Sequence, residues 1–527
     1  MKSFKSVLAG GGVCLAAVFL TIPFILLSQP TSQEFWIVEA MREMRQHFQL
    51  VPRLNGMELP GQNPIQIMLL SCLPASIALG RLVMIVLGLI LAASLYLYSH
   101  LLWGWRAGVC AVLFTVSSIG FLQGFSLLNT AALPCAFFIW GYLIFSLAYL
   151  KGWSRNWYLL AYVCVLAAML LGGLELVVLF VGAVILLILF DLSPQRFSRI
   201  RPVIGLGALI GTAFIFYVTY RISGGSSYVG GILWPGGHLG LFKALAFVFH
   251  ATLPWLPLLV PAWIFTARPE EWEDWRTLLP AKIALILVVV LLWFSGQGIG
   301  GYAFLAAPPA GLLIGYWAGG GLRVATRLKI VRRIAFLCTA LILLVLPIVD
   351  LGLNPRTVLD LSMVQIILLI ATFATVAAML FMVRGRRHGA AIIAGLLAVC
   401  VLAWQAPLSE RNEGPSADYL ESIARYQPLL VLEDDLVMRG ALGFSGVQPL
   451  VVSGAFVPVG GEAYLAVATG KLKRLLKNLQ GRMQASAVIK TLRGTTYALI
   501  RVAPQAPQES PPESPAPDPV PRDAEGI

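Results

Sequence analysis

Long apolar runs are the feature that most constrains the fold of this chain. We count thirteen of them before residue 407, many near the roughly 20 apolar residues that a helix needs to cross a bilayer. The sequence is 58% hydrophobic and 12% charged, whereas an ordinary soluble domain carries about 25% charged residues. Because unpaired backbone polar groups are excluded from lipid, the runs predict an all-α polytopic membrane protein with about 13 transmembrane helices. The predicted spans are Val7–Leu27, Leu82–Trp103, Ala107–Phe121, Ala131–Leu150, Tyr158–Leu171, Leu174–Phe190, Val203–Tyr220, Leu241–Phe265, Ala281–Phe294, Tyr302–Trp317, Ile334–Val349, Val364–Val383 and Ala390–Trp404.

Positive charge is distributed unevenly between the loops that join these runs. With the N-terminus in the cytoplasm, 19 Lys and Arg residues fall on the cytoplasmic side and 7 outside, as the positive-inside rule requires. A further span at Ile65–Leu79 would reverse every later loop, so we interpret that segment as an interfacial helix at the outer surface. The pattern predicts a multi-pass protein of the bacterial inner membrane. The net charge of +13 is then a signal of topology, and we expect no binding of nucleic acid.

Composition divides the chain into three parts. Residues 1–406 form the predicted transmembrane domain, in which residues 28–79 make a polar and aromatic outer loop. Residues 407–503 alternate strand-like and helix-like segments, which predicts a small α/β domain, and the odd number of spans places it in the periplasm. The tail 504–527 is rich in Pro and is predicted to be disordered. The strand-like segments are Leu429–Glu433, Pro449–Gly454, Tyr464–Thr469, Ala487–Lys490 and Tyr497–Val502, and the helix-like ones are Ser416–Tyr426 and Gly470–Leu479.

Cysteine and histidine give no sign of a metal site. All seven cysteines fall in apolar segments, and the five histidines are scattered along the chain. The sequence contains no CxxC and no other metal-ligand spacing, so it indicates neither a disulfide framework nor a zinc site.

Short motifs follow one another in a fixed order along the transmembrane part. They are Gln33-Glu34, Arg42-Glu43-Met44, Val51–Gly56, Gly80-Arg81-Leu82, Arg106-Ala107-Gly108 and Leu253-Pro254-Trp255. In this order they resemble the motifs of the GT-C glycosyltransferases, in the group of the aminoarabinose transferases and the protein-mannosyltransferase-like enzymes. The resemblance covers nearly the whole chain, including a soluble α/β domain after the last span.

The resemblance implies a function at the outer face of the membrane. Such enzymes move a sugar from a polyprenyl-phosphate carrier to a lipid, glycan or protein acceptor. The chain departs from the family at several charged positions: Gln33 replaces an Asp, Gly61 a Glu and Gln62 a Lys, and the segment Leu171–Leu174 lacks a Lys. A catalytically degenerate homologue that binds a lipid-linked sugar or scaffolds a partner is therefore an alternative. A transporter is a third interpretation, against which stand the absence of an internal repeat and the few ionisable residues within spans.

Transfer from a phosphate carrier needs a base near the acceptor and a cationic side chain or a divalent cation at the leaving phosphate. We predict Glu34 as the base, because it follows the family's Asp position at the mouth of the first span. The alternative is that Glu34 caps the helix that follows. Candidates for contact with the phosphate or the sugar are Arg81, Arg53, Lys243, Arg221, Glu58, Glu175 and Tyr302.

Each of the other candidates has a simpler structural interpretation. Arg81 could snorkel to the interface, and Tyr302 could belong to an aromatic belt. Glu175, at the outer end of a span, could reach the interface without contacting a ligand. Glu39 and Glu43, four residues apart beside Arg42, have the spacing of a solvated helix face.

Overall fold

The chain forms two compact units, Met1–Asn412 and Glu413–Ile527. A computed structural model describes residues 11–12, 18, 20–22, 31–47, 51, 53–55, 57–58, 64–191, 202–222, 240–265, 272–294, 297–319, 326–353, 363–384, 393 and 395–399 of the first unit. In the second unit it describes residues 429–432, 438–439, 441–442, 450–452, 463–468, 483–491 and 497–504.

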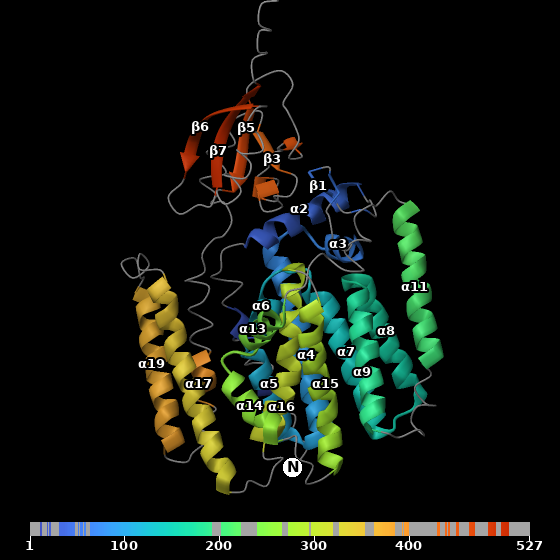
Figure 1. Cartoon of the computed structure of the whole chain (residues 1–527), viewed down its shortest axis with the longest axis vertical. Helices are drawn as coiled ribbons and strands as arrows, with labels where there is room; N and C mark the ends of the chain where they lie inside the picture. Colours follow the sequence, from blue (N-terminus) through green and yellow to red (C-terminus); the bar gives the residue numbers. More distant parts are fainter. Residues whose placement is uncertain are drawn as a thin grey trace, which may run out of the picture. The chain divides into compact units, whose positions relative to one another are not determined.

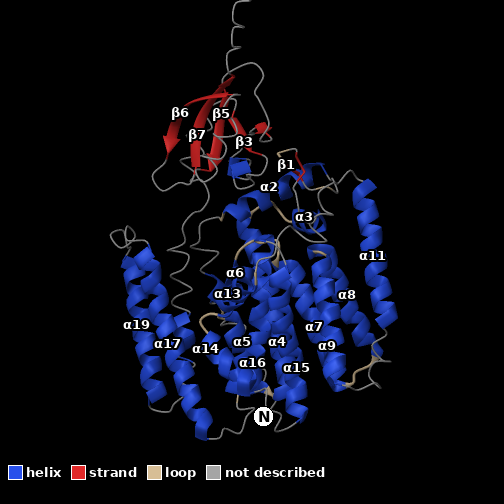
Figure 2. Cartoon of the chain, in the orientation of Figure 1, coloured by secondary structure: helices blue, strands red, loops and turns tan. Residues whose placement is uncertain are grey.

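The described part of the first unit is helical apart from one short hairpin (Figures 1 and 2). Its helices are α2 (Ser32–His47), α3 (Pro64–Ser71), α4 (Ile77–Trp103), α5 (Trp105–Val116), α6 (Ile119–Ser126), α7 (Ala132–Lys151), α8 (Arg155–Gly172), α9 (Leu174–Asp191), α11 (Pro202–Ile222), α13 (Leu241–Thr252), α14 (Leu256–Phe265), α15 (Trp272–Phe294), the 3₁₀ helix η1 (Gln297–Ala306), α16 (Ala307–Ala318), α17 (Thr326–Leu353) and α19 (Met363–Arg384). The hairpin pairs β1 (Arg53–Leu54) with β2 (Met57–Glu58).

Four helices of the described residues are long and apolar enough to cross a membrane, and the number rises to six if each of two bent pairs is one span. The four lie in α4, α7, α8 and α15. The predicted spans Val7–Leu27 and Ala390–Trp404 fall largely outside the described residues, so the total of thirteen stays a prediction. Helix α3 has eight residues and is about 12 Å long, too short to cross. Ile77–Leu79, predicted as part of the same interfacial helix, belongs to α4.

Two predicted spans are each built from two helices rather than one. Helices α5 and α6 meet at 69°, and α13 and α14 meet at 105°. At the first break the hydroxyl of Ser118 donates to the carbonyl of Thr115 at 2.6 Å, and such bonds offer the backbone an alternative to the helix. At the second break Pro254 has no N–H to continue the helix. The runs Ala107–Phe121 and Leu241–Phe265 are therefore not single helices.

The two breaks pack against each other. The N–H of Ile119 donates to the carbonyl of Leu253 at 2.9 Å, and the indole Nε1–H of Trp255 donates to the hydroxyl of Ser117 at 2.9 Å. The Trp255 ring is buried and meets the Phe114 ring edge to face, with centroids 4.8 Å apart. Each break thus supplies hydrogen-bond partners to the other, as irregular backbone within a membrane requires.

Replacing Ser117 by alanine is expected to destabilise the protein by about 1–3 kcal/mol, because the buried indole N–H of Trp255 then loses its acceptor. Thermal unfolding of the detergent-solubilised protein measures the effect. The matched control is Ser94→Ala, because the Ser94 hydroxyl bonds to the Ile90 carbonyl of its own helix, toward solvent or lipid. Equal unfolding temperatures for both variants would show that the hydrogen bond between Ser117 and Trp255 does not stabilise the protein.

Helices α5 and α16 approach closely along a line of small residues. Three glycines spaced four residues apart, Gly311, Gly315 and Gly319, lie on α16 and just after it. They face Ala107, Ala111 and Thr115 of α5. A Cβ at Gly315 would lie 2.5 Å from the Ala111 Cα, and one at Gly319 would lie 2.7 Å from the Ala107 Cα. This is the small-xxx-small packing by which membrane helices bring their backbones together.

A buried ionic cluster joins α7, α9 and α15. The carboxylate of Asp191, the last residue of α9, lies 2.6 Å from the Nε of Arg276. The Tyr149 hydroxyl donates to the same carboxylate at 2.7 Å. A carboxylate at a helix C-terminus opposes the helix dipole, so the Arg276 guanidinium and the Tyr149 phenol offset that cost.

The second unit contains a five-stranded sheet in the order β4-β3-β5-β7-β6. Strand β3 (Leu429–Leu432) pairs in parallel with β4 (Leu450–Val452) and β5 (Ala463–Ala468), whereas β7 (Tyr497–Pro504) pairs antiparallel with β5 and β6 (Met483–Thr491). Each of the five strands overlaps one of the five strand-like segments of the sequence, although β6 begins four residues before the predicted Ala487. The helix-like segments Ser416–Tyr426 and Gly470–Leu479, and the tail beyond residue 504, lie outside the described residues, so the α/β class stays a prediction.

Candidate functional site

Glu34 caps the helix in which it lies. The backbone N–H of Thr31 donates to Glu34 Oε2 at 2.8 Å, and the N–H of Glu34 lies 3.4 Å from the Thr31 hydroxyl. This reciprocal pair is the capping box expected of Thr followed three residues later by Glu. The local sequence Thr31-Ser-Gln-Glu34 therefore fixes both the start of α2 and the orientation of the carboxylate.

The same carboxylate forms a buried, bidentate ion pair with Arg81 of α4. Arg81 Nε donates to Glu34 Oε1 at 2.7 Å and Arg81 Nη2 donates to Oε2 at 2.6 Å. The backbone N–H of Leu128, two residues after α6, also donates to Oε1, at 2.9 Å. Glu34 is 0% exposed and Arg81 is 2% exposed. The carboxylate thus ties α2 to α4 and to the end of α6.

The pairing bears directly on the two roles that the sequence predicts for these residues. A carboxylate offers about four lone-pair positions, and donors from Thr31, Arg81 and Leu128 supply four hydrogen bonds to Glu34. An acceptor hydroxyl that reached Glu34 would have to displace one of these donors. The Arg81 guanidinium likewise directs two of its N–H groups at Glu34 rather than at a phosphate.

A second polar pair joins Glu175, in the first turn of α9, to Tyr302 of η1. The Tyr302 hydroxyl donates to Glu175 Oε1 at 3.2 Å and lies 3.5 Å from the Gly172 carbonyl oxygen. Both side chains are half-buried. Gly173, at φ +139°, precedes α9, and a Cβ there would overlap the Glu175 carboxylate. Only glycine adopts this φ readily, so Gly173 makes room for the carboxylate beside the helix start.

Helix α6 connects the two polar pairs. Its residue Phe125 meets Phe304 of η1 edge to face at 5.4 Å, and Phe304 covers Gly124. Phe304 lies two residues after Tyr302, and Leu128, whose N–H donates to Glu34, lies three residues after Phe125. Figure 1 shows α2 and α3 lying across one end of the long helices. Glu34 belongs to α2, and Gly172, beside the Glu175–Tyr302 pair, ends α8, which packs against α3.

The remaining predicted residues lie at the surface or have side chains outside the described part. Arg53 is exposed in β1, and its cross-strand neighbour is Glu58, whose side chain is not described. Lys243 is exposed in the first turn of α13, which packs against η1 and α6. Arg221 lies near the end of α11, and its side chain is also not described.

Glu39 and Glu43 do not form the solvated face that their spacing predicts. Glu39 is 7% exposed and accepts a hydrogen bond from Arg42 Nη1 at 2.8 Å. The pKa of the Glu39 carboxyl is raised overall. Burial is the largest cause, Arg42 lowers the pKa in part, and Glu43 raises it further. Glu43 instead accepts from the N–H of Asn55, the turn residue of the hairpin. Glu39 is flanked in sequence by the apolar residues Ile37, Val38, Ala40 and Met41, and this was the signal for its burial. All four of these neighbours are buried.

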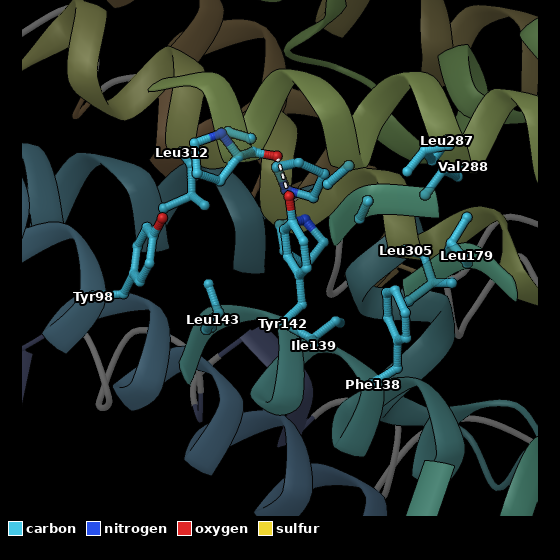
Figure 3. A pocket seen from close by; sticks show the side chains of 16 residues that line it. Tyr98, Phe138, Ile139, Tyr142, Leu143, Leu179, Leu287, Val288, Leu305 and Leu312 are labelled. Atoms are coloured by element: carbon cyan, nitrogen blue, oxygen red, sulfur yellow. Dashed lines mark hydrogen bonds between the residues drawn. The ribbon is translucent and has the colours of Figure 1, made fainter. Parts of the chain in front are cut away.

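A small apolar cavity of about 30 Å³ lies between α4, α7, α9, α15, η1 and α16 (Figure 3). Tyr142 points into it and donates its hydroxyl proton to the Pro280 carbonyl at 2.7 Å. Leu179 of α9 and Leu305 of η1 are among the lining residues. Sequence reasoning missed this cavity, because its wall comes from six separate segments.

The charged side chains do not gather as metal ligands. Among the described residues no group of three or more His, Cys, Asp or Glu side chains is arranged to hold a metal ion.

The apolar helices of the first unit mark the chain as a multi-pass membrane protein, and the chain shares its fold with solved structures of ArnT. The solved structure of ArnT from Cupriavidus metallidurans in the apo state matches with a TM-score of 0.69 at 15% identity, over 95% of this chain and 98% of that one. The same protein bound to undecaprenyl phosphate matches with a TM-score of 0.65 at 15% identity, over the same shares. No family model matches the chain, and no curated protein matches it in sequence. The predicted resemblance is confirmed at the level of the fold.

Proposed function

We propose that this protein is an integral-membrane glycosyltransferase. It moves a sugar from a polyprenyl-phosphate carrier to a lipid, glycan or protein acceptor on the extracytoplasmic face. The observation that carries the proposal is the match, over 95% of the chain, to a structure that was solved with bound undecaprenyl phosphate. In this topology the N-terminus is cytoplasmic, and the C-terminal unit is extracytoplasmic.

The chemistry divides between the two polar pairs and the exposed cations. With Arg81 held by Glu34, the exposed side chains of Arg53 and Lys243 are the predicted cations that remain accessible to a phosphate group in solution or at the lipid surface. Charge-assisted hydrogen bonds to phosphate are stronger than neutral ones.

A second candidate function is a homologue that binds the carrier without transferring its sugar. The observation that favours it is the Glu34–Arg81 pair, since the predicted base and the predicted phosphate ligand satisfy each other. The departures from the family at Gln33, Gly61 and Gln62 point the same way. Losing one preorganised group of this kind commonly costs about 10²–10³ in rate.

One preparation distinguishes the candidates. The full chain is reconstituted in lipid nanodiscs, binding of undecaprenyl phosphate is measured, and undecaprenyl-phosphate sugars are then added with lipid and glycan acceptors. Release of undecaprenyl phosphate together with a glycosylated acceptor supports the transferase. Binding with no release supports the non-catalytic homologue, and no binding contradicts both.

The exposed cations are expected to contribute to carrier affinity. Replacing Lys243 by alanine should weaken undecaprenyl phosphate binding about tenfold, because a hydrogen bond to a charged group contributes about 1.5 kcal/mol. The matched control is Lys151→Ala, which removes an exposed lysine from the last turn of α7. Equal loss of affinity in both variants would show that only net charge matters, and no loss in either would remove Lys243 from the site.

A further inference from the structure

We infer that Glu175, positioned by Tyr302, is the general base that takes the proton of the attacking acceptor hydroxyl. The inference rests on the proposed function and assigns a residue within it. Three observations support it: the hydrogen-bond partners of the carboxylates near α2 and the start of α9, the local structure of α9 and η1, and the cavity beside these two elements.

The other described carboxylates at this end already have strong donors. Glu34 receives two N–H groups of Arg81, Glu39 is paired with Arg42, and Glu43 accepts from the N–H of Asn55. Among the described residues no Lys, Arg or His forms an ion pair with Glu175. Glu175 is also the more accessible group, since it is half-buried where Glu34 is 0% exposed. Within the described part of the chain, no cation therefore competes with a hydroxyl proton for its carboxylate.

The backbone around Glu175 holds the carboxylate in one place. Oε2 lies directly over Gly173, where the missing Cβ leaves room for it. Tyr302 donates to Oε1 at 3.2 Å. A general base works only when it is within hydrogen-bond reach of the proton that it takes. The phenol fixes one oxygen and so orients the other, which makes Tyr302 a positioning residue.

The apolar cavity lies on the same faces of the two elements that carry this pair. Leu179 is four residues after Glu175 on α9, and side chains at this spacing lie one above the other on an α-helix. Leu305 is three residues after Tyr302 on η1, and side chains at this spacing eclipse in a 3₁₀ helix. Both leucines line the cavity. The polar pair therefore lies one turn from an apolar wall, which suits an acceptor that is an alcohol with an apolar body, such as a glycolipid.

The transfer step balances with Glu175 in this role. The acceptor O–H bond breaks, and its proton goes to the Glu175 carboxylate. The acceptor oxygen forms a bond to the anomeric carbon, while the bond between that carbon and the phosphate oxygen breaks. The electron pair of the broken bond leaves with the polyprenyl phosphate.

The test compares carboxylate variants in nanodiscs, with a glycolipid acceptor and an undecaprenyl-phosphate sugar. Glu175→Gln is expected to lower kcat at least about 100-fold, the usual contribution of a general base, with undecaprenyl phosphate affinity within about threefold of wild type. Tyr302→Phe is expected to lower kcat about tenfold and to move the pH profile of kcat. Glu39→Gln is the carboxylate control and is expected to keep wild-type turnover.

Chemical rescue separates a base from a structural residue. Added formate is expected to restore part of the turnover of Glu175→Ala and none of that of Glu34→Ala. Wild-type turnover in Glu175→Gln, or a loss of turnover that parallels a loss of carrier affinity, would overturn this inference and leave the proposed transferase standing. Carrier binding without turnover in the wild type would overturn the base and the transferase together, whereas the carrier-binding homologue would remain.

Discussion

Replacing Gly315 by alanine is expected to prevent α16 from packing on α5 and to lower both the yield of folded protein and its unfolding temperature. The added Cβ would lie 2.5 Å from the backbone N and Cα of Ala111. Backbone atoms cannot rotate away as a side chain can, so the two helices must separate. Over-packing of this kind costs about 1–3 kcal/mol and occasionally more. The measurement is thermal unfolding of the detergent-solubilised protein with size-exclusion chromatography of the same sample.

The chain supplies a matched control for this substitution. Gly211 lies within helix α11, and a Cβ added there would meet no atom of the described residues within 4 Å. Gly211→Ala is expected to leave the unfolding temperature unchanged or slightly higher, because alanine has the better helix propensity. If Gly315→Ala behaved like Gly211→Ala, the close approach of α5 and α16 would be contradicted.

Replacing Glu34 by glutamine is expected to destabilise the protein by about 3–5 kcal/mol. The change keeps the shape of the side chain but leaves the Arg81 guanidinium buried at 2% exposure without the countercharge of Glu34, and loss of one partner of a buried ion pair has costs in this range. Arg81→Met should give a similar loss, because it leaves the Glu34 charge uncompensated. Both effects are measured by thermal unfolding in detergent.

The double variant separates the stabilisation that the ion pair provides from the destabilisation caused by leaving one charge unpaired. Glu34→Leu combined with Arg81→Met removes both charges, and it is expected to be more stable than either single variant, because well-packed apolar side chains often replace a buried ion pair at little cost. A Glu34→Gln protein that unfolds at the wild-type temperature but transfers no sugar would contradict the structural role of the Glu34–Arg81 ion pair. It would instead support Glu34 as the base, as the sequence predicts.

The long helices could be predicted from sequence because each of them is a nearly continuous apolar run. Helix α4, for example, extends the predicted span Leu82–Trp103 by only five residues at its start. The breaks inside two runs could not be read from hydropathy, since Ser117-Ser118 and Leu253-Pro254 interrupt neither run. Their sharp angles depend on contacts between segments more than 130 residues apart, such as the bond from Trp255 to Ser117.

The candidate site could be predicted only in part from the sequence, for a similar reason. Charged or polar residues at the ends of apolar runs identified Glu34, Arg81, Glu175 and Tyr302 one by one. That the four form two pairs depends on approaches across 47 and 127 residues of chain, which no local pattern records. The spacing of Gly311, Gly315 and Gly319 is a readable signal for close helix packing, although it does not indicate which helix is the partner.

The cluster of Asp191, Arg276 and Tyr149 has a consequence for biogenesis. Tyr149 is synthesised 42 residues before Asp191, whereas Arg276 follows 85 residues after it. At ordinary ribosome speeds of about 5–20 residues per second, Asp191 waits roughly 4–17 s for its arginine. During that interval the phenol is the one member of the cluster already made, so the carboxylate must be hydrated at the membrane surface or shielded by the insertion machinery. The countercharge of Asp191 is therefore supplied only when α15 is made, well after α7 and α9.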